Sequence, residues 1–339
     1  MAGSQGVELC IAVCEAGGLG SIPCAMLKPE TLREEISVIR AATAAPFNVN
    51  FFTHRQPVPD PAREAAWLAR LSDYYTEKGV DPASIPTGPG RSPYDEGMLR
   101  VVEETKPPIV SFHFGLPDND LLTRTKATGA KIFSSATTVA EARWLEEHGV
   151  DVVIAQGREA GGHRGMFLTE DIEAQPGLFS LLPQIVDAVR VPVVAAGGIG
   201  DGRGIAAAFA FGASAAQIGT AYLLTPQATT SPVHRAALRG ARDDATRITN
   251  LYTGRPARGL LTRFMRELGP ISSDAPAFPL ATGAVAPLRA AAEKDGSGDF
   301  SPLWSGEAGA FAREEDARET TRRLWREAQT VMRAMAARV

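Results

Sequence analysis

Short apolar segments alternate with helical segments along the first two thirds of the chain, and this alternation limits the fold more than any other feature. Seven apolar or β-branched segments have the composition of buried strands; they span residues 18–23, 47–52, 109–114, 131–135, 152–155, 191–195 and 216–219. Amphipathic segments with helical periodicity lie between and beside them, at residues 8–16, 29–42, 61–77, 118–129, 139–148, 178–189 and 202–211. This pattern predicts an α/β fold in which helices cover a parallel sheet.

The number of strands predicts a (β/α)₈ TIM barrel that lacks its first strand in the sequence as given. Seven strands are predicted where a closed barrel has eight. The chain passes from Met1 into a helix almost at once, as a strand-to-helix loop would. We expect residues 1–224 to form barrel strands two to eight, completed by the charged C-terminal helix 314–339.

The remaining residues predict a smaller, mainly helical cap on the substrate side of the barrel. The cap is expected over residues 225–313, of which residues 225–303 are rich in Pro, Gly, Thr and Arg and show helical pieces but no clear strands. Residues 78–97 are rich in proline and glycine and predict a long loop, of a length that is usually functional or disordered.

Composition and charge favour an enzyme that acts on a small molecule. The net charge of −4 argues against a nucleic-acid partner. No apolar run reaches the ~18 residues of a membrane span, and the N-terminus lacks the basic stretch of a signal peptide, so we expect a cytoplasmic protein with no membrane partner. Cys10, Cys14 and Cys24 are too few for a disulfide framework. We expect buried thiols rather than metal ligands.

Glycine-rich segments follow the last two predicted strands. Gly197 and Gly198 follow strand seven, and Gln217, Gly219 and Thr220 end strand eight. Glycines let backbone N–H groups approach a phosphate closely, and the N-terminus of the following helix favours negative charge. Tight turns would also use glycine, but two such loops on these consecutive strands favour the usual phosphate site of a barrel.

The active site of such a barrel lies at the C-terminal ends of its strands, and this location draws attention to two histidines. His163 lies among glycines in the loop after strand six, where an imidazole can act as a base or a hydrogen-bond donor near neutral pH. His113 lies near the end of strand four, where a structural interior histidine is an equally good interpretation. Asn50 on strand three carries an amide that can pair with a heterocycle or cap a loop.

Motifs along nearly the whole chain resemble the nitronate monooxygenase family, formerly called 2-nitropropane dioxygenase. The Ala160–His163 segment is shared with FMN-dependent enoyl-ACP reductases, whereas Ser111–Gly115 and Gly254–Arg258 favour the nitronate enzymes. The motifs are Met1-Ala2-Gly3, Ala16-Gly17-Gly18-Leu19-Gly20, Phe47-Asn48-Val49-Asn50-Phe51, Ser111-Phe112-His113-Phe114-Gly115, Glu159-Ala160-Gly161-Gly162-His163, Gly197-Gly198-Ile199, Gln217-Ile218-Gly219-Thr220 and Thr253-Gly254-Arg255-Pro256-Ala257-Arg258.

The resemblance implies an FMN cofactor and the oxidation of an alkyl nitronate by O₂ to a carbonyl compound and nitrite. It implies that His163 is catalytic and that His113 is a second histidine of the pocket. The implied cofactor contacts are Gly3 and Asn50 at the flavin ring, Gln156 and Gly161 at the ribityl chain, and Gly197, Gly198, Gly219 and Thr220, with Gln217 beside them, at the phosphate. Residues 299–307 depart from the family pattern, since Phe300, Trp304 and Glu307 stand where pocket tyrosines are often found.

Two other functions stay open at this point. One is an NADH-dependent flavin reductase of the same barrel family, acting on a quinone or an enoyl thioester. The other, suggested by the missing strand, is an inactive flavin-binding or partner-binding protein. Assembly as a homodimer also stays open.

Overall fold

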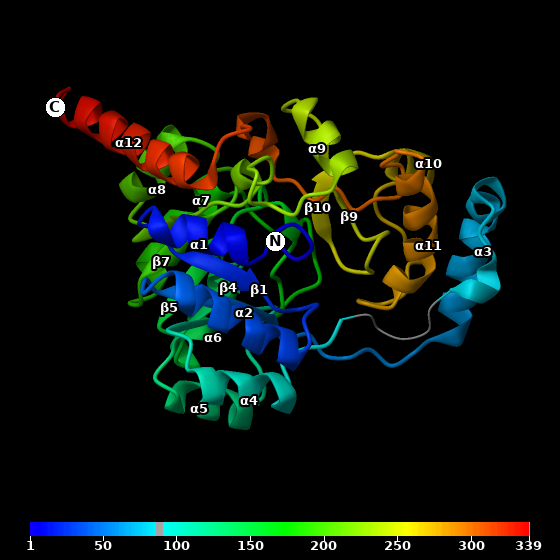
Figure 1. Cartoon of the computed structure of the whole chain (residues 1–339), viewed down its shortest axis with the longest axis horizontal. Helices are drawn as coiled ribbons and strands as arrows, with labels where there is room; N and C mark the ends of the chain where they lie inside the picture. The colour runs from blue at the N-terminus through cyan, green and yellow to red at the C-terminus, as the bar shows by residue number, and fades with distance from the viewer. Residues whose placement is uncertain (86–90, 339) are drawn as a thin grey trace.

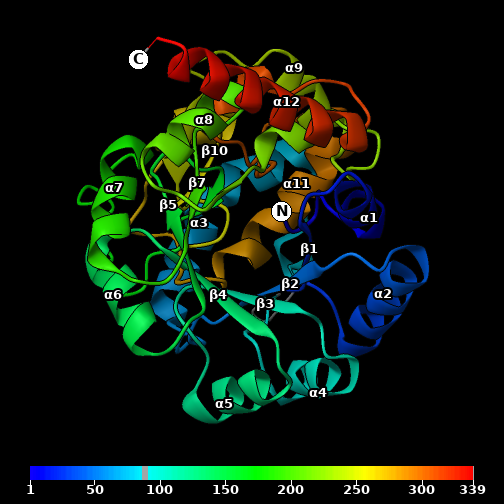
Figure 2. The same cartoon turned by 90° about the vertical axis from the view of Figure 1, so that its left-hand side faces the viewer.

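Seven parallel strands form one curled sheet in the computed structural model, which describes residues 1–85 and 91–338. The order β1-β2-β3-β4-β5-β7-β8 follows the chain (Figure 2), as successive strand–helix–strand units require. The strands are β1 (Gly20–Pro23), β2 (Phe47–Phe52), β3 (Ile109–His113), β4 (Lys131–Ala136), β5 (Val152–Gln156), β7 (Val193–Ala196) and β8 (Ala215–Gln217). The predicted α/β fold of the TIM-barrel type is confirmed.

The two faces of the sheet differ in polarity. In β2, Val49 and Phe51 are buried in the core that the sheet shares with its helices. Asn48 and Asn50 occupy the alternate positions, and the register pairs Asn50 with Ser111 of β3. Because side chains of equal parity point to the same face, these polar residues lie on the inner face of the sheet. There the Asn48 amide donates to Ser111 Oγ over 2.8 Å.

Helices cover the outer face of the sheet (Figure 2). The segment at α4 was not predicted as a helix, although Asp95 caps it by accepting from the Met98 N–H over 2.9 Å. Proline and glycine in the preceding loop obscured its apolar spacing. The covering helices are α1 (Val7–Glu15), α2 (Pro29–Ala42), α4 (Glu96–Thr105), α5 (Asn119–Ala127), α6 (Val139–Glu147), α7 (Leu178–Ala188), α8 (Gly202–Ala210) and α12 (Ala317–Ala336).

The C-terminal helix α12 packs closely against α8. A side chain at Gly202 would collide with the backbone of α12, with its Cβ about 2.5 Å from the Glu327 carbonyl carbon. The Gly202 N–H also donates to the Glu327 carboxylate over 3.1 Å. This glycine therefore lets the first turn of α8 approach the last long helix.

A second group of elements lies at one side of the barrel (Figure 1). Helix α3 (Pro61–Lys78) packs against α11 (Ala281–Lys294), with α10 (Arg263–Leu268) beside them. The expectation that residues 225–303 contain no strands is wrong, because β9 (Thr246–Thr249) and β10 (Ala257–Leu260) pair antiparallel. The segment Ala-Arg-Gly-Leu of β10 shows no alternation, and it is a strand only because its neighbours pair with it on both sides.

The shorter elements connect these groups. They are the two-residue strand β6 (Gly162–His163), helix α9 (Pro232–Arg239) and the 3₁₀ turns η1 (Pro82–Ser84), η2 (Thr220–Tyr222) and η3 (Glu307–Phe311). The predicted loop 78–97 includes residues 86–90, which lie outside the described residues. In the described part of the chain, no helix combines the length and apolar character needed to cross a membrane.

We expect Phe264→Ala to destabilise the protein by about 3–5 kcal/mol, the usual cost of emptying a buried aromatic site. Phe264 is completely buried and packs against Trp67 of α3 and Phe300, with ring centroids 6.2 and 5.5 Å away. The measurement is chemical denaturation of both variants. Phe179→Ala is the control, because Phe179 is 74% exposed and should cost less than about 1 kcal/mol. Equal losses of stability in the two variants would contradict the conclusion that Phe264 packs in a buried aromatic core with Trp67 and Phe300.

Candidate functional site

His163 lies in a short strand that joins the barrel to the cap. The loop after β5 continues into β6, which pairs antiparallel with β10, and the register sets His163 opposite Ala257. The Arg164 N–H extends this pairing by donating to the Pro256 carbonyl over 2.9 Å. The predicted glycine loop thus includes a strand, and its histidine is fixed by backbone hydrogen bonds from a segment about ninety residues away.

Two side chains at the ends of barrel strands hold the backbone of His163. The His163 carbonyl accepts from Gln156 Nε2 over 3.0 Å and from His113 Nε2 over 3.1 Å. Gln156 Oε1 accepts the Gly165 N–H over 2.8 Å. Gln156 therefore holds the loop at His163 and at Gly165, on both sides of Arg164. Three residues predicted for the site, His163, His113 and Gln156, are brought together here.

The hydrogen bonds of His113 define its protonation. A carbonyl can only accept, so Nε2 must carry a proton toward His163, and Nδ1 then accepts from Ser135 Oγ, 3.1 Å away. Burial, with a smaller contribution from the charge of Arg255, lowers the pKa of His113 to about 3. The hydrogen bond to the His163 carbonyl acts in the opposite direction and raises the pKa. His113 is therefore neutral near pH 7, and it positions the loop of His163.

The imidazole of His163 is held by Thr253 and surrounded by aromatic rings. Its Nε2 lies 3.0 Å from Thr253 Oγ1, and the Thr253 hydroxyl reaches the Arg255 carbonyl over 3.4 Å. When that hydroxyl donates to the carbonyl, its oxygen can only accept from Nε2–H, and the lone pair of the imidazole is left on Nδ1. The surrounding ring centroids lie 5.2–6.0 Å away and belong to Phe52, Phe114, Phe278 and Trp304.

Electrostatics keep His163 neutral. Its pKa lies well below the ordinary 6.5, first because burial disfavours the cation and then because Arg91, His113 and Arg255 lie near. No carboxylate is among the groups that shift it. A neutral imidazole at pH 7 can accept a proton from a substrate without first losing one of its own.

The residue after His163 is a completely buried arginine. Arg164 donates to Gly157 O (2.6 Å), Gln156 O (2.9 Å) and Gln175 Oε1 (2.8 Å). These acceptors are all neutral, and burial lowers the pKa of Arg164 to about 10. Every nitrogen of its guanidinium is nevertheless hydrogen-bonded. The side chain of Arg164 therefore links Gln156 and Gly157, at the start of the loop, to Gln175 near its end.

Glu141 holds the far end of the same loop. Its Oε1 accepts the backbone N–H groups of Phe167 (2.6 Å) and Leu168 (3.1 Å). Its Oε2 accepts from Thr137, which in turn accepts from the Gln175 amide over 3.0 Å. A buried anion and a buried cation are therefore linked through Gln175 and Thr137, a buried arrangement in which every member has a partner.

The predicted phosphate loop after β7 has the backbone conformation that glycine allows. Gly197 and Gly198 have φ values of +114° and +67°, and a side chain at Gly197 would press against the Ala160 nitrogen at 3.0 Å. Among the described residues, no acceptor receives the N–H of Gly198 or of Ile199. These donors precede the N-terminus of α8, where an anion is favoured.

The segment 305–307, which we call the strap, packs over the predicted cofactor residues Gly161 and Thr220. The Gly306 N–H donates to Thr220 Oγ1 over 2.9 Å, and the Glu307 N–H donates to the Glu159 carbonyl over 3.0 Å. A side chain on Gly161 would meet the Ser305 carbonyl carbon at 2.6 Å. The strap therefore joins the ends of β5 and β8.

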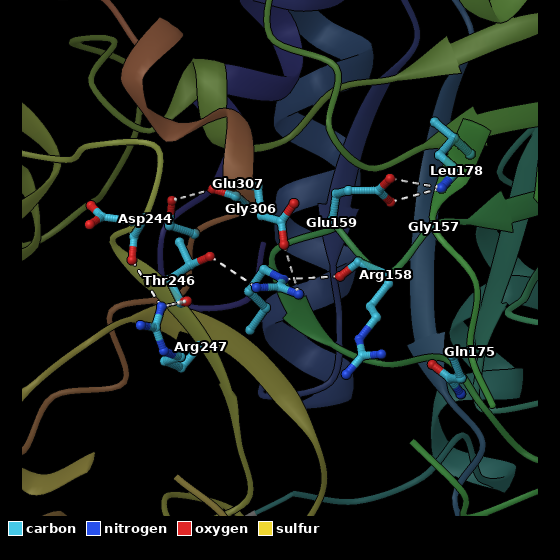
Figure 3. A network of polar contacts seen from close by, with 12 residues as sticks. Gly157, Arg158, Glu159, Gln175, Leu178, Asp244, Thr246, Arg247, Gly306 and Glu307 are labelled. Atoms are coloured by element: carbon cyan, nitrogen blue, oxygen red, sulfur yellow. Dashed lines mark hydrogen bonds and ion pairs between the residues drawn. The ribbon is translucent and has the colours of Figure 1, made fainter. Parts of the chain in front are cut away.

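Arg258 of β10 ties the strap to the barrel and the cap. Its guanidinium donates to the Arg158 carbonyl (2.9 Å) and to Thr246 Oγ1 (3.0 Å), and it pairs with the Glu307 carboxylate at 3.0 Å. Figure 3 shows these groups converging, with the Glu159 carboxylate turned the other way onto the Leu178 N–H at the start of α7. Two carboxylates thus hold this loop, at Glu159 and at Glu307.

Two hollows at the molecular surface lie away from His163. One of about 260 Å³ lies beside the Arg258 network, between Arg158 and Pro270. A larger one, of about 400 Å³, lies between α8 and α12 and is lined by arginines of both segments. Neither touches His163 or His113, so the geometry of the strand ends, rather than a surface hollow, defines the candidate site.

The remaining predicted residues lie around this centre. Asn50 Oδ1 accepts from Ser111 Oγ over 2.7 Å, and its NH₂ group makes no hydrogen bond with the described residues. Met1 lies next to Gly219, so the start of the chain, with Gly3, meets the end of β8. Gln217 is exposed on the edge strand, and among the described residues it forms no hydrogen bond with His163 or His113.

Sequence reasoning did not predict the aromatic and basic residues around His163. Phe278 reaches the site because Gly254, with φ +86°, lets its turn approach the backbone of residues 276–278. Arg255 lies over the face of Phe114, 4.0 Å from the ring centroid. The motif Thr253–Arg258 was visible, but which of its side chains would face the histidine depended on this approach.

The whole chain is similar to known nitronate monooxygenases. The family model described as nitronate monooxygenase matches residues 1–327. A nitronate monooxygenase of Paraburkholderia phytofirmans is 41% identical over 330 residues, which are 96% of this chain and 90% of that protein. One from Pseudomonas aeruginosa is 42% identical over 326 residues, covering 96% and 93%.

Solved structures agree with this similarity. A nitroalkane oxidase from Streptomyces ansochromogenes superposes with a TM-score of 0.89 at 39% identity, covering 99% of this chain and 95% of the other. FabK from Thermotoga maritima gives a TM-score of 0.75 at 27% identity, covering 100% and 94%. Because the family model and both relatives span nearly the full length, the chain belongs to the nitronate monooxygenase family, and with it to the flavin-dependent oxidoreductases.

Proposed function

We propose that this protein binds FMN and oxidises alkyl nitronates with O₂, giving a carbonyl compound and nitrite. The observation that carries the proposal is the neutral imidazole of His163, fixed by Thr253 and by the β6–β10 pairing beside the glycine loops of β7 and β8. The same proposal assigns residues 1–224 with 314–339 to cofactor binding and residues 225–313 to the substrate-side cap.

The residues at the strand ends fit a flavin mononucleotide. The free N–H groups of Gly198 and Ile199 suit the phosphate, and Gly161 and Thr220 lie beside them under the strap. The unbonded NH₂ of Asn50 on the inner face of the sheet suits an acceptor on the flavin ring. When bound, FMN would supply the redox chemistry, taking electrons from the substrate and passing them to O₂.

His163 would act on substrates that arrive protonated at the carbon that carries the nitro group. A neutral nitroalkane must lose that proton before oxidation, whereas a nitronate is already deprotonated. His163 Nδ1, with its lone pair free when Thr253 holds Nε2–H, is the group for this step. Phe52, Phe114 and Phe278 would keep water from the reacting carbon.

We expect the purified protein to carry non-covalent FMN. The single phosphate-type loop pair, with no dinucleotide fingerprint after a first strand, favours the mononucleotide. The measurement is the mass of the flavin released on denaturation. A folded protein that releases FAD, or none after incubation with FMN, would contradict this. Rapid anaerobic bleaching by NADH would instead favour the flavin reductase alternative.

We expect His163→Asn to lower turnover of a neutral nitroalkane by about 10²–10⁴-fold, the usual contribution of a general base, and to affect the nitronate much less. Because burial lowers the pKa of His163, the base stays deprotonated down to pH 6.5. In wild-type enzyme, kcat/KM for the nitroalkane should therefore fall only at lower pH, and this acidic limb should vanish in the variant.

Thr253→Val is the companion variant, since it removes the partner of Nε2 and leaves the imidazole. It should lower the turnover of the neutral nitroalkane, but by a smaller factor than His163→Asn does. Equal losses of turnover with nitroalkane and nitronate in His163→Asn would show that His163 is a binding residue. Unchanged turnover of both substrates would show that another group is the base.

A further inference from the structure

Arg255 is a half-buried cation with a buried Nε atom that has no hydrogen-bond acceptor among the described residues. Its Nη2 donates to the Met166 carbonyl, but its Nε is buried and makes no hydrogen bond. Among the described residues, no carboxylate lies within ion-pair distance of Arg255. Burial lowers its pKa to about 10, and the more distant charges of Glu170 and Glu141 act in the opposite direction. Leaving a buried charged donor unpaired is costly.

His54, just beyond β2, is a second buried donor without a partner. It is 5% exposed, and neither ring nitrogen makes a hydrogen bond of normal geometry with the described residues. Burial, Arg255 and Arg91 lower its pKa to about 4, against a smaller raising effect of the Arg91 backbone. His54 is therefore neutral near pH 7 and has one N–H to donate.

His54 and His163 flank the same aromatic cluster, formed by Phe52, Phe114 and Phe278. The His54 ring lies 4.7 Å from Phe278 and 6.3 Å from both Phe52 and Phe114. His163 lies 5.2–6.0 Å from the same three rings. The unpartnered donors are therefore next to the proposed catalytic base.

Arg91 adds a further positive charge to this surrounding. Its guanidinium lies 6.0 Å from the Phe278 ring and donates to Thr282 Oγ1 over 2.9 Å. It has no ion pair with a described carboxylate, and burial lowers its pKa. Two arginines and three neutral histidines thus surround this apolar region. Among the described residues, no side chain supplies negative charge there at hydrogen-bond distance. The surrounding residues are Arg91, Arg255, His54, His113 and His163.

The contrast with Arg164 separates a structural arginine from this one. Arg164 is completely buried, whereas Arg255 is half-buried, and the Nε, Nη1 and Nη2 atoms of Arg164 all have acceptors. Arg255 has an orphan Nε, and the nearby His54 has two orphan nitrogens. A site with excess positive charge and unused donors is complementary to an anion with several oxygen atoms.

We propose that Arg255 and His54 bind the oxygen atoms of the nitronate group, and of the nitrite that leaves, so that this pair selects the anionic substrate. The inference rests on the proposed function and deepens it. His163 would serve the neutral nitroalkane, and Arg255 with His54 would serve the anion. The two sets of variants should therefore differ on the nitronate: His163→Asn should affect it little, whereas variants of Arg255 and His54 should weaken its binding.

Arg255→Met should raise KM for the nitronate about 10- to 100-fold, the usual loss for a charge-assisted hydrogen bond. Its kcat/KM for the matching neutral nitroalkane should fall as well, because deprotonation by His163 forms the same anion at this site. His54→Phe keeps the ring and removes the donor, and its effect on the nitronate should be smaller, about 3- to 10-fold. Arg255→Lys, which keeps the charge without Nε, should fall between wild type and Arg255→Met and covers the case in which Arg255→Met does not fold.

Nitrite binding to the flavin-loaded enzyme, measured by calorimetry, gives a readout that does not depend on turnover. Its Kd should weaken in Arg255→Met by the same factor as the nitronate KM. Arg100→Met is the matched control, because its side chain is 69% exposed on α4, and it should leave both values unchanged.

Equal losses on nitronate and nitroalkane, with unchanged nitrite affinity, would overturn the proposal and make Arg255 structural. A wild-type enzyme that binds nitrite through Arg255 but does not oxidise nitronates would retain the anion site and reject the proposed function. Normal nitronate oxidation in Arg255→Met would retain the function and reject the anion site.

Discussion

The carbonyl oxygen of His163 receives two hydrogen bonds from the interior of the barrel, and the site depends on them. His113 and Gln156 stand at the ends of β3 and β5, so the spacing of the sheet fixes the distance between their side chains. The clamp is a backbone contact, which leaves the imidazole of His163 free for Thr253 and for chemistry. A polar side chain in a parallel barrel is costly unless it is hydrogen-bonded, and here the hydrogen bonds position the loop that carries His163.

Buried charge holds the same loop from outside. Arg164 binds its beginning and Glu141 its end, and Gln175 and Thr137 connect the two. Because each charged atom has partners, the desolvation cost is offset, and the loop has few alternatives of similar energy. The Nε atom of Arg255 and both ring nitrogens of His54 lack such partners, and this difference is the basis for proposing that they bind a ligand.

Glycine is required where segments distant in the sequence approach each other. Gly161 faces the strap, Gly202 faces α12 and Gly254 faces residues 276–278, each at distances that exclude a Cβ. The strap then covers Thr220, and Arg258 connects it to β10 through Glu307. Cap and barrel are thus joined at the same strand ends where the residues proposed to bind the cofactor lie.

The sequence by itself determined the seven parallel strands, the glycine loops after the last two and the position of His163 near the barrel mouth. These follow from local periodicity and from the rule that parallel strands end at one edge. Only the tertiary structure decided that β6 pairs with β10, that α3 packs on α11, and that Thr253 meets His163. Those contacts join residues about ninety to two hundred positions apart, and the strands involved are two to four residues long. Segments so short have no periodicity of their own, so long-range packing alone determines their partners.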